Sequence, residues 1–254
     1  MHQIKALVFD VFGTVVDWRS SVVSQLEAFG ERHGIAAGKT DWVKFAEQWR
    51  SSRRIAIGGG GSTNVDVMHR EILDEMLDQP EWAHIGKAWD DVTRVEVNLS
   101  WHRLKGWPDA VEGLKELKKD YILATLSNGN IRLLVDMAKY AGLPWDIIFS
   151  TELFDTFKPN PKAYLETMRH LGITDPSQCA MVAAHLYDVR AAGSVGMSTI
   201  YVSRPKEDNA TEVGQGGVKS KKEGGEVDLV VTSFVELAKM LREGKRGGDS
   251  GSVN

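Results

Sequence analysis

Residues 4–17 read IKALVFDVFGTVVD, and this stretch decides the fold that the rest of the chain must complete. The run from Ile4 to Phe9 is largely apolar, with β-branched and aromatic residues, which is typical of a buried strand. Asp10 and Gly13 then end the run in a tight turn, so Asp10 is predicted to lie at the carboxyl end of the strand, where open parallel α/β sheets bind ligands. Asp10 is therefore a candidate functional residue, although an Asp after a strand also commonly caps the next helix.

The composition is that of a folded chain with one large core and a smaller module. The chain has 254 residues, of which 42% are hydrophobic and 26% charged. Its net charge is -4, and acidic and basic residues are interleaved along the sequence. This charge pattern does not predict a basic surface that would bind nucleic acid or an anionic membrane. No apolar stretch approaches the roughly 20 residues of a membrane helix, and no signal-peptide pattern is present, so we expect a cytoplasmic protein. Cys179, the single cysteine, is expected to be a buried structural thiol.

From Pro108 onward, strand-like runs alternate with helical ones, which predicts a parallel sheet wound on both faces. The expected strands are 121–126, 147–149, 181–184, 198–202 and 227–231, and the expected helices are 109–119, 131–141, 162–171, 188–194 and 234–241. The stretch 204–226 is interpreted as a solvated surface loop and 247–254 as a frayed tail. Neither of them is expected to carry chemistry.

A helical segment interrupts this pattern between the first strand and Pro108. Residues 18–33 have helical spacing of apolar positions, and 41–107 combine helical periodicity with many Trp, Arg and His residues and no clean strand pattern. The glycine run 58–61 is interpreted as a loop between two helices. A phosphate-binding loop would need a strand before it and Lys-Ser or Lys-Thr after it, and the sequence has neither.

Polar residues follow the predicted strands at the edge where they would face one crevice. They are Asp10 and Thr14 after the first strand, Ser127 and Asn128 after the next, Lys158 before a helix that starts with proline, and Asp188 after 181–184. Each residue has a simpler alternative role, because Ser127, Asn128 and Asp188 can cap helices and Lys158 can be a solvated charge. Their joint occurrence in this order is much less expected by chance.

This order of motifs resembles the haloacid dehalogenase superfamily, which places a nucleophilic Asp, a Ser or Thr, a Lys and an acidic group on successive strand ends. The resemblance covers residues 4–17 and 108–242. It implies an α/β fold in which a Rossmann-like, doubly wound parallel sheet forms a core domain from residues 1–17 and 108–246. An inserted α-helical cap domain would then comprise 18–107, and 247–254 would be a disordered tail.

The same motifs discriminate between the two reactions of this superfamily, attack on phosphorus and attack on a carbon that bears a halogen. Its phosphatases have a second Asp two residues after the nucleophile, where this chain has Phe12, and an acid where it has Ala184. Asp10 and Asp188 then remain as the carboxylate ligands for Mg²⁺, so metal binding is predicted to be weak and no cofactor is expected. A halide leaves as a stable anion without a proton, so the substitutions favour carbon–halogen cleavage.

Within the superfamily, the turn 10–17, the Trp49-Arg50 pair and Lys158 followed by Tyr164 look like type II, L-specific 2-haloacid dehalogenases. That resemblance implies hydrolysis of short L-2-haloacids to 2-hydroxy acids through an ester on Asp10. Arg50 would accept the halide, and Asp188 would orient or deprotonate the water. The catalytic residues so implied are Asp10, Thr14, Arg50, Ser127, Asn128, Lys158 and Asp188, and the substrate-binding residues are Val11, Phe12, Trp49, Tyr164, His185 and Tyr187.

Several alternatives stay open at this point. His185 stands where the best-known members of that family carry an Asn, and it could form the hydrogen bond of that amide, assist as a base, or be structural. Arg50 could be a solvated helix charge. The other functions to weigh are a Mg²⁺-dependent phosphatase and a non-catalytic binding protein of the same fold. The expected partners are a small 2-haloacid and a halide ion, with no nucleic acid or membrane, and a homodimer is left open.

Overall fold

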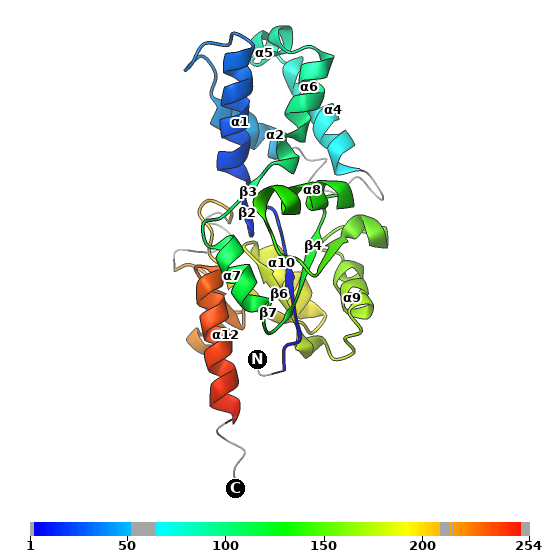
Figure 1. The fold of residues 1–254 in the computed structure, drawn as a ribbon, viewed down its shortest axis with the longest axis vertical. Coiled ribbons are helices and arrows are strands. Elements are labelled where there is room, and N and C mark those ends of the chain that lie inside the picture. The colour runs from blue at the N-terminus through cyan, green and yellow to red at the C-terminus, as the bar shows by residue number, and fades with distance from the viewer. Residues whose placement is uncertain (1–2, 52–63, 209–213, 215, 250–254) are drawn as a thin grey trace.

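The chain folds into a six-stranded parallel sheet with a group of helices above the carboxyl ends of its strands (Figure 1). The computed structural model describes residues 3–51, 64–208, 214 and 216–249. The sheet order is β5-β4-β1-β6-β7-β8, so β1 is central and pairs in parallel with both β4 and β6. The strands are β1 (Ala6–Phe9), β4 (Ile122–Ser127), β5 (Ile147–Ser150), β6 (Cys179–Ala183), β7 (Ser198–Val202) and β8 (Leu229–Val231).

Helices cover both faces of this sheet, which confirms the predicted doubly wound arrangement. Side chains alternate along β1, so Leu7 and Phe9 join one buried cluster with α7, α8 and α12, while Ala6 and Val8 join a second cluster with α9 and α10. Both clusters are apolar, which explains why β1 reads as a nearly continuous hydrophobic run. These helices are α7 (Ala110–Leu117), α8 (Ile131–Ala141), α9 (Pro161–His170), α10 (Leu186–Ser194) and α12 (Phe234–Asp249).

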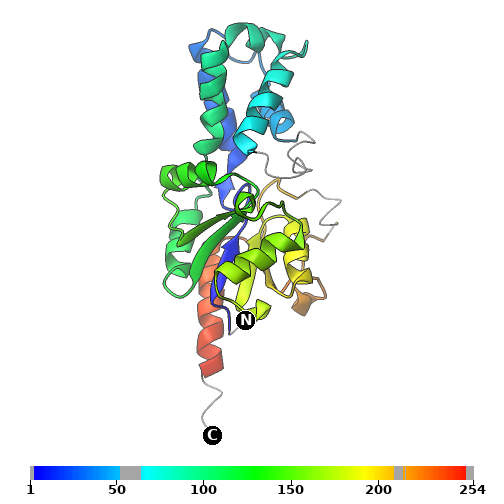
Figure 2. The ribbon, with the colours of Figure 1, turned by 90° about the vertical axis from the view of Figure 1, so that its right-hand side faces the viewer.

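The remaining helices form a separate layer beyond the sheet, the cap (Figure 2). They are α1 (Trp18–Arg32), α2 (Trp42–Arg50), α4 (Val65–Leu77), α5 (Ala83–Ala88) and α6 (Asp91–Asn98), followed by a 3₁₀ turn at Leu99–His102. Stacked and edge-on aromatic rings fill the cap; the Trp42 and Trp89 rings, for example, lie 5.8 Å apart. The tryptophan-rich composition of the insertion is thus explained by aromatic packing in the cap, which is continuous with the buried cluster of Leu7 and Phe9.

A short antiparallel ribbon joins the cap to the sheet. It pairs β2 (Val16–Asp17) with β3 (Lys105–Gly106), and the carboxylate of Asp17 accepts a hydrogen bond from the backbone N–H of Ser20 to cap α1. The sequence pattern did not predict β3, because two residues are too few to show alternation. Next to the ribbon, Trp107 donates its indole N–H to the carbonyl of Gly13 at 2.8 Å, which ties the end of the insertion to the turn after β1.

Other predicted boundaries differ by small shifts at strand and helix ends. Strand β1 begins at Ala6 rather than Ile4, and β6 begins at Cys179, whose side chain is buried as expected. Helix α12 continues to Asp249 and so includes residues 247–249 of the predicted tail. The glycine run 58–61 lies outside the described residues. Across the described ranges, no helix combines the length and apolar character of a membrane span.

Candidate active site

Asp10 directly follows β1, and the turn after it directs its carboxylate toward several donors. Gly13 adopts a φ of 80°, a conformation that favours glycine, and this brings Thr14 back toward Asp10. The Thr14 hydroxyl donates to Asp10 Oδ2 at 2.7 Å and accepts from the backbone N–H of Ala184 at 2.9 Å. Because Ala184 occupies the acceptor side of the hydroxyl, the Thr14 proton is directed to the carboxylate.

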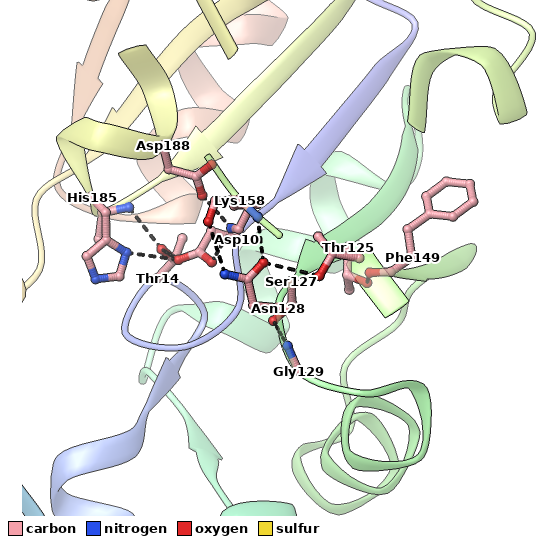
Figure 3. A network of polar contacts seen from close by, with 12 residues as sticks. Asp10, Thr14, Thr125, Ser127, Asn128, Gly129, Phe149, Lys158, His185 and Asp188 are labelled. Atoms are coloured by element: carbon pink, nitrogen blue, oxygen red, sulfur yellow. Dashed lines mark hydrogen bonds and ion pairs between the residues drawn. The ribbon is translucent and has the colours of Figure 1, made fainter. Parts of the chain in front are cut away.

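Lys158 lies between two buried carboxylates (Figure 3). Its Nζ is 2.7 Å from Asp10 Oδ1 and 2.5 Å from Asp188 Oδ2, and only 1% of its side chain is exposed. The segment before α9 is held in place by Asn128, whose Oδ1 accepts from the backbone N–H of Lys158 at 2.8 Å. Tyr164, one turn into α9, donates its hydroxyl to Asp188 Oδ1 at 2.5 Å. Chain segments distant in sequence therefore meet at one ammonium group.

Electrostatics in this cluster favour an ionised Asp10. Burial opposes its charge, but the Lys158 ammonium and the His185 ring outweigh burial and hold the pKa of Asp10 well below its usual range. Burial likewise disfavours the ammonium, yet the charges of Asp10 and Asp188 raise the pKa of Lys158 above its ordinary value. Asp188 differs, because burial outweighs its attraction to Lys158 and raises its pKa. Asp10 is thus the carboxylate that stays available as an anion.

His185 contacts Asp10 from the other side, and its second partner comes from a segment that we expected to carry no chemistry. His185 Nδ1 is 3.0 Å from Asp10 Oδ2, and Nε2 is 3.2 Å from Oε2 of Glu207, in the loop after β7. Glu207 also accepts the indole N–H of Trp18 at 2.9 Å. The prediction of a purely solvated loop was therefore wrong for this residue, whose side chain is only 6% exposed.

Tertiary contacts explain how the loop reaches the site. Arg204 donates to the carbonyl of Thr14 at 3.0 Å and pairs with Asp109 at 2.7 Å, which anchors the chain just before Glu207. A Cβ on Gly13 would lie 2.0 Å from Glu207 Oε2, so glycine is needed there for space as well as for its φ angle. No local sequence pattern around Glu207 points to this position.

The hydroxyl and amide after β4 complete the sheet side of the site. Ser127 Oγ accepts from the backbone N–H of Gly129 at 3.2 Å, which leaves its own proton free to donate. Asn128 Oδ1 accepts from Lys158 and from the Thr151 hydroxyl at 3.1 Å. Asn128 Nδ2 forms only a long 3.4 Å contact with the Lys158 carbonyl, so this amide retains donor capacity. Neither Ser127 nor Asn128 caps the following helix α8, whose N-cap residue is Asn130.

A cavity of about 470 Å³ lies between the sheet edge and the cap. Arg50, at the end of α2, lines it from the cap side, with its guanidinium 5.3 Å from the Phe12 ring and 5.0 Å from the Trp18 ring. Tyr187 stacks on His185 at 5.6 Å and is 45% exposed. Of the predicted residues, those that line the cavity are Asp10, Phe12, Arg50, Ser127, Asn128, Lys158, His185 and Tyr187.

The other predicted residues lie behind this lining. Thr14 contacts Asp10, Tyr164 contacts Asp188, and Asp188 contacts Lys158 from a fully buried position in the first turn of α10. Val11 and Trp49 are core residues; the Trp49 N–H donates to the backbone carbonyl of His69, so its predicted place in the cavity wall is wrong. The large indole is accommodated in the aromatic core of the cap instead.

His69, which was not among the predicted residues, lines the cavity from α4. Its ring stacks on Trp101 at 4.5 Å, and within the described part of the chain neither ring nitrogen has a hydrogen-bond partner. Burial and the nearby charge of Arg50 lower the pKa of His69 to about 3, so the ring is neutral. The one available signal was the apolar stripe of α4, where His69 falls between Val65 and Ile72 on the buried face.

Comparison with known proteins identifies the family. Residues 4–196 match the model of the haloacid dehalogenase-like hydrolases. The chain belongs to this hydrolase family. It is 28% identical over 214 residues to (S)-2-haloacid dehalogenase 4A of Burkholderia cepacia, covering 80% of this chain and 85% of that one. The crystal structure of a defluorinating L-2-haloacid dehalogenase superposes with a TM-score of 0.78 at 36% identity, covering 94% of this chain and 95% of that one.

The chain is also similar to a phosphatase. The phosphoglycolate phosphatase of Chromobacterium violaceum is 27% identical over 250 residues, 96% of this chain and 99% of that one. A phosphatase site would require Asp10 and Asp188 to share a Mg²⁺ ion, which prefers several oxygen ligands. All four oxygens of these two carboxylates already face a donor or the His185 ring. Across the described part of the chain no cluster of three acidic, His or Cys side chains could hold a metal ion, so the residues present do not fit Mg²⁺.

Proposed function

We propose that this hydrolase cleaves the carbon–halogen bond of short L-2-haloacids and produces the inverted 2-hydroxy acid. The observation that supports this most directly is the ionised Asp10 carboxylate, buried beside Lys158 at the surface of a small cavity. A carboxylate in that setting is a nucleophile that water does not shield. The names of relatives spanning most of the chain agree with this chemistry.

In the first half of the proposed reaction, an Asp10 oxygen attacks the α-carbon from the side opposite the halogen. A new carbon–oxygen bond forms as the halide departs with the bonding electrons, and the substrate becomes an ester on Asp10. Arg50 faces the site across the cavity, and its weakly hydrated guanidinium suits a halide ion. Ser127 and Asn128 have donor protons free for the substrate carboxylate, since their other contacts use acceptor atoms or are long.

No proton needs to reach the leaving group, and this distinguishes the proposal from a phosphatase. The residue two positions after the nucleophile is Phe12, whose ring lies against the Arg50 guanidinium. A phosphomonoester would leave an alkoxide that requires an acid, whereas a halide is a stable anion. We therefore propose that catalysis proceeds without a metal cofactor, with Lys158 supplying the positive charge beside Asp10.

Halide release tests this proposal directly. We expect the protein to release chloride from L-2-chloropropionate, with little activity on the D-enantiomer and no loss after EDTA treatment. Asp10→Asn should abolish release, because a neutral amide is not a nucleophile here. Absence of chloride release by the native protein, or release that persists in Asp10→Asn, would refute the proposal. Turnover of p-nitrophenyl phosphate that depends on added Mg²⁺ would instead support the phosphatase.

A further inference from the structure

His185 holds an unusual position, because it contacts the nucleophile and a second buried carboxylate at the same time. Nδ1 faces Asp10 and Nε2 faces Glu207, at 3.0 and 3.2 Å. A carboxylate accepts at each nitrogen, so the ring carries both protons. Burial opposes this charge, but the hydrogen bonds and charges of Asp10 and Glu207 outweigh burial and raise the pKa of His185 to about 10.

Formation of the Asp10 ester changes that balance. An ester has no negative charge, so His185 loses one of the two carboxylates that stabilise its protonated form. The pKa of the ring therefore falls, and the proton on Nδ1 is the one released because Nε2 still donates to Glu207. Neutral His185 then has a free lone pair directed at the carbonyl group that water must attack.

The alternative base, Asp188, is poorly placed for that step. Its Oδ1 accepts from the Tyr164 hydroxyl and its Oδ2 from Lys158, both at 2.5 Å. The side chain is completely buried and does not line the cavity, whereas His185 does. A water molecule in the cavity can thus reach His185 beside Asp10, while Asp188 serves to hold Lys158.

We propose that His185 is the base that activates water for hydrolysis of the Asp10 ester, and that Glu207 is the positioning residue that keeps the remaining proton on Nε2. This inference rests on the proposed function, since it requires an ester on Asp10. It gives a role to a loop residue that the sequence pattern assigned to solvent, and it replaces the water-activating role expected for Asp188.

The proposed step conserves atoms and charge. The water oxygen bonds to Asp10 Cγ while one water proton moves to His185 Nδ1. With the substrate on Oδ2, the oxygen beside His185, the negative charge of the tetrahedral intermediate lies on Oδ1 and faces Lys158. The bond between Cγ and the substrate oxygen then breaks, and His185 returns its proton to that oxygen to give the 2-hydroxy acid. The new carboxyl proton of Asp10 passes to His185, which restores the starting pair. Over the whole cycle one halide ion and one proton are released.

Glu207→Gln tests the orienting role sharply, because Trp18 determines which way the new amide points. The Trp18 N–H requires an acceptor, so the Gln oxygen should face Trp18 and the Gln NH₂ should face His185 Nε2. Nε2 must then accept, which places the proton of the neutral ring on Nδ1. In that tautomer Nδ1 cannot take a proton from water, so we expect ester hydrolysis to slow by about 100-fold to 10,000-fold.

The experiment follows halide release and the intact protein mass after rapid mixing with L-2-chloropropionate. We expect Glu207→Gln to release about one chloride per active site in a fast first turnover, then to stall with the alkyl ester visible on Asp10. Steady-state kcat should fall while the first-turnover rate stays close to that of the native protein. The matched control is Glu81→Gln on the cap surface, where Glu81 pairs with Lys44, and it should turn over normally.

His185→Gln provides a second variant in case Glu207→Gln does not fold. Its amide can still donate to Asp10 but cannot accept a proton, so it should also accumulate the ester. Normal steady-state turnover in either folded variant, or accumulation of ester only in Asp188→Asn, would overturn the inference while leaving the dehalogenase proposal intact. Absence of both halide and ester in the native protein would overturn the proposed function itself.

Discussion

Replacing Lys158 by Met should destabilise the protein far more than the loss of an ordinary lysine would. The ammonium is 1% exposed and neutralises two carboxylates, Asp10 and Asp188, at 2.7 and 2.5 Å. Removing one partner of a buried ion pair costs about 3–5 kcal/mol, which corresponds to a fall in Tm of about 6–20 °C at ~2–4 °C per kcal/mol. Thermal unfolding followed by circular dichroism at pH 8 measures this difference.

The pH dependence of this deficit has a definite sign. Burial already raises the pKa of Asp188, and without the ammonium this pKa rises further, so stability is retained at low pH and lost as pH increases through the folded pKa of Asp188. The Tm deficit of Lys158→Met should therefore shrink as the pH is lowered from 8 to 5. Adding Asp188→Asn should recover part of the loss at pH 8, because one uncompensated charge is removed.

An exposed lysine provides the control for this series. Lys118 pairs with Asp146 at 2.6 Å and its side chain is 37% exposed, so Lys118→Met should cost about 1 kcal/mol or less. If Lys158→Met had the same Tm as the native protein at pH 8, the interpretation of Lys158 as the charge that balances two buried carboxylates would be refuted. It would also be refuted if Asp188→Asn made the Lys158 variant less stable still.

Three further outcomes follow from the site and the cap. Arg50→Ala should lower kcat/KM for L-2-chloropropionate by about 10-fold or more, measured by chloride release, because the halide loses its cationic acceptor; an unchanged value would remove Arg50 from the site. His69→Phe keeps the stack on Trp101 and removes two buried ring nitrogens that have no partner among the described residues, so Tm should rise by about 2–4 °C in thermal unfolding; a fall in Tm would contradict this interpretation. His102 donates to Asp66 of the cap and Asp136 of the core, and these contacts outweigh burial and raise its pKa above 6.5. Its contribution to the free energy of unfolding, ~1 kcal/mol, is present below pH 6.5 and lost as pH rises through the folded pKa. The difference in Tm between the native protein and His102→Gln should therefore narrow toward pH 9.

The fold was largely predictable because its signals are local. The apolar run before Asp10, the alternation of strands and helices after Pro108, and the proline at the start of α9 each act within a few residues. The strand β3 was missed for a reason that is also local, since two residues are too few to show the alternation of a strand. The family resemblance rested on the same short motifs.

The candidate site was predictable only in part. Asp10, Ser127, Asn128 and Lys158 could be anticipated because the carboxyl ends of parallel strands meet at one edge of a sheet. The position of Trp49 could not be predicted, because the sequence pattern of a helical tryptophan is the same whether its ring lines a cavity or packs in an aromatic core. His69 was passed over for a similar reason, since it belongs to the buried stripe of α4.

Neighbouring residues were enough to establish a wound parallel sheet, a helical insertion and an aspartate at a strand end, because turn chemistry and hydrophobic periodicity act over short stretches of chain. Only tertiary packing places Lys158 between Asp10 and Asp188 and buries Asp188 behind the cavity lining. Tertiary packing also brings Glu207 into contact with His185. Those contacts depend on where the sheet order and the anchored loop bring distant segments together, which no local pattern records.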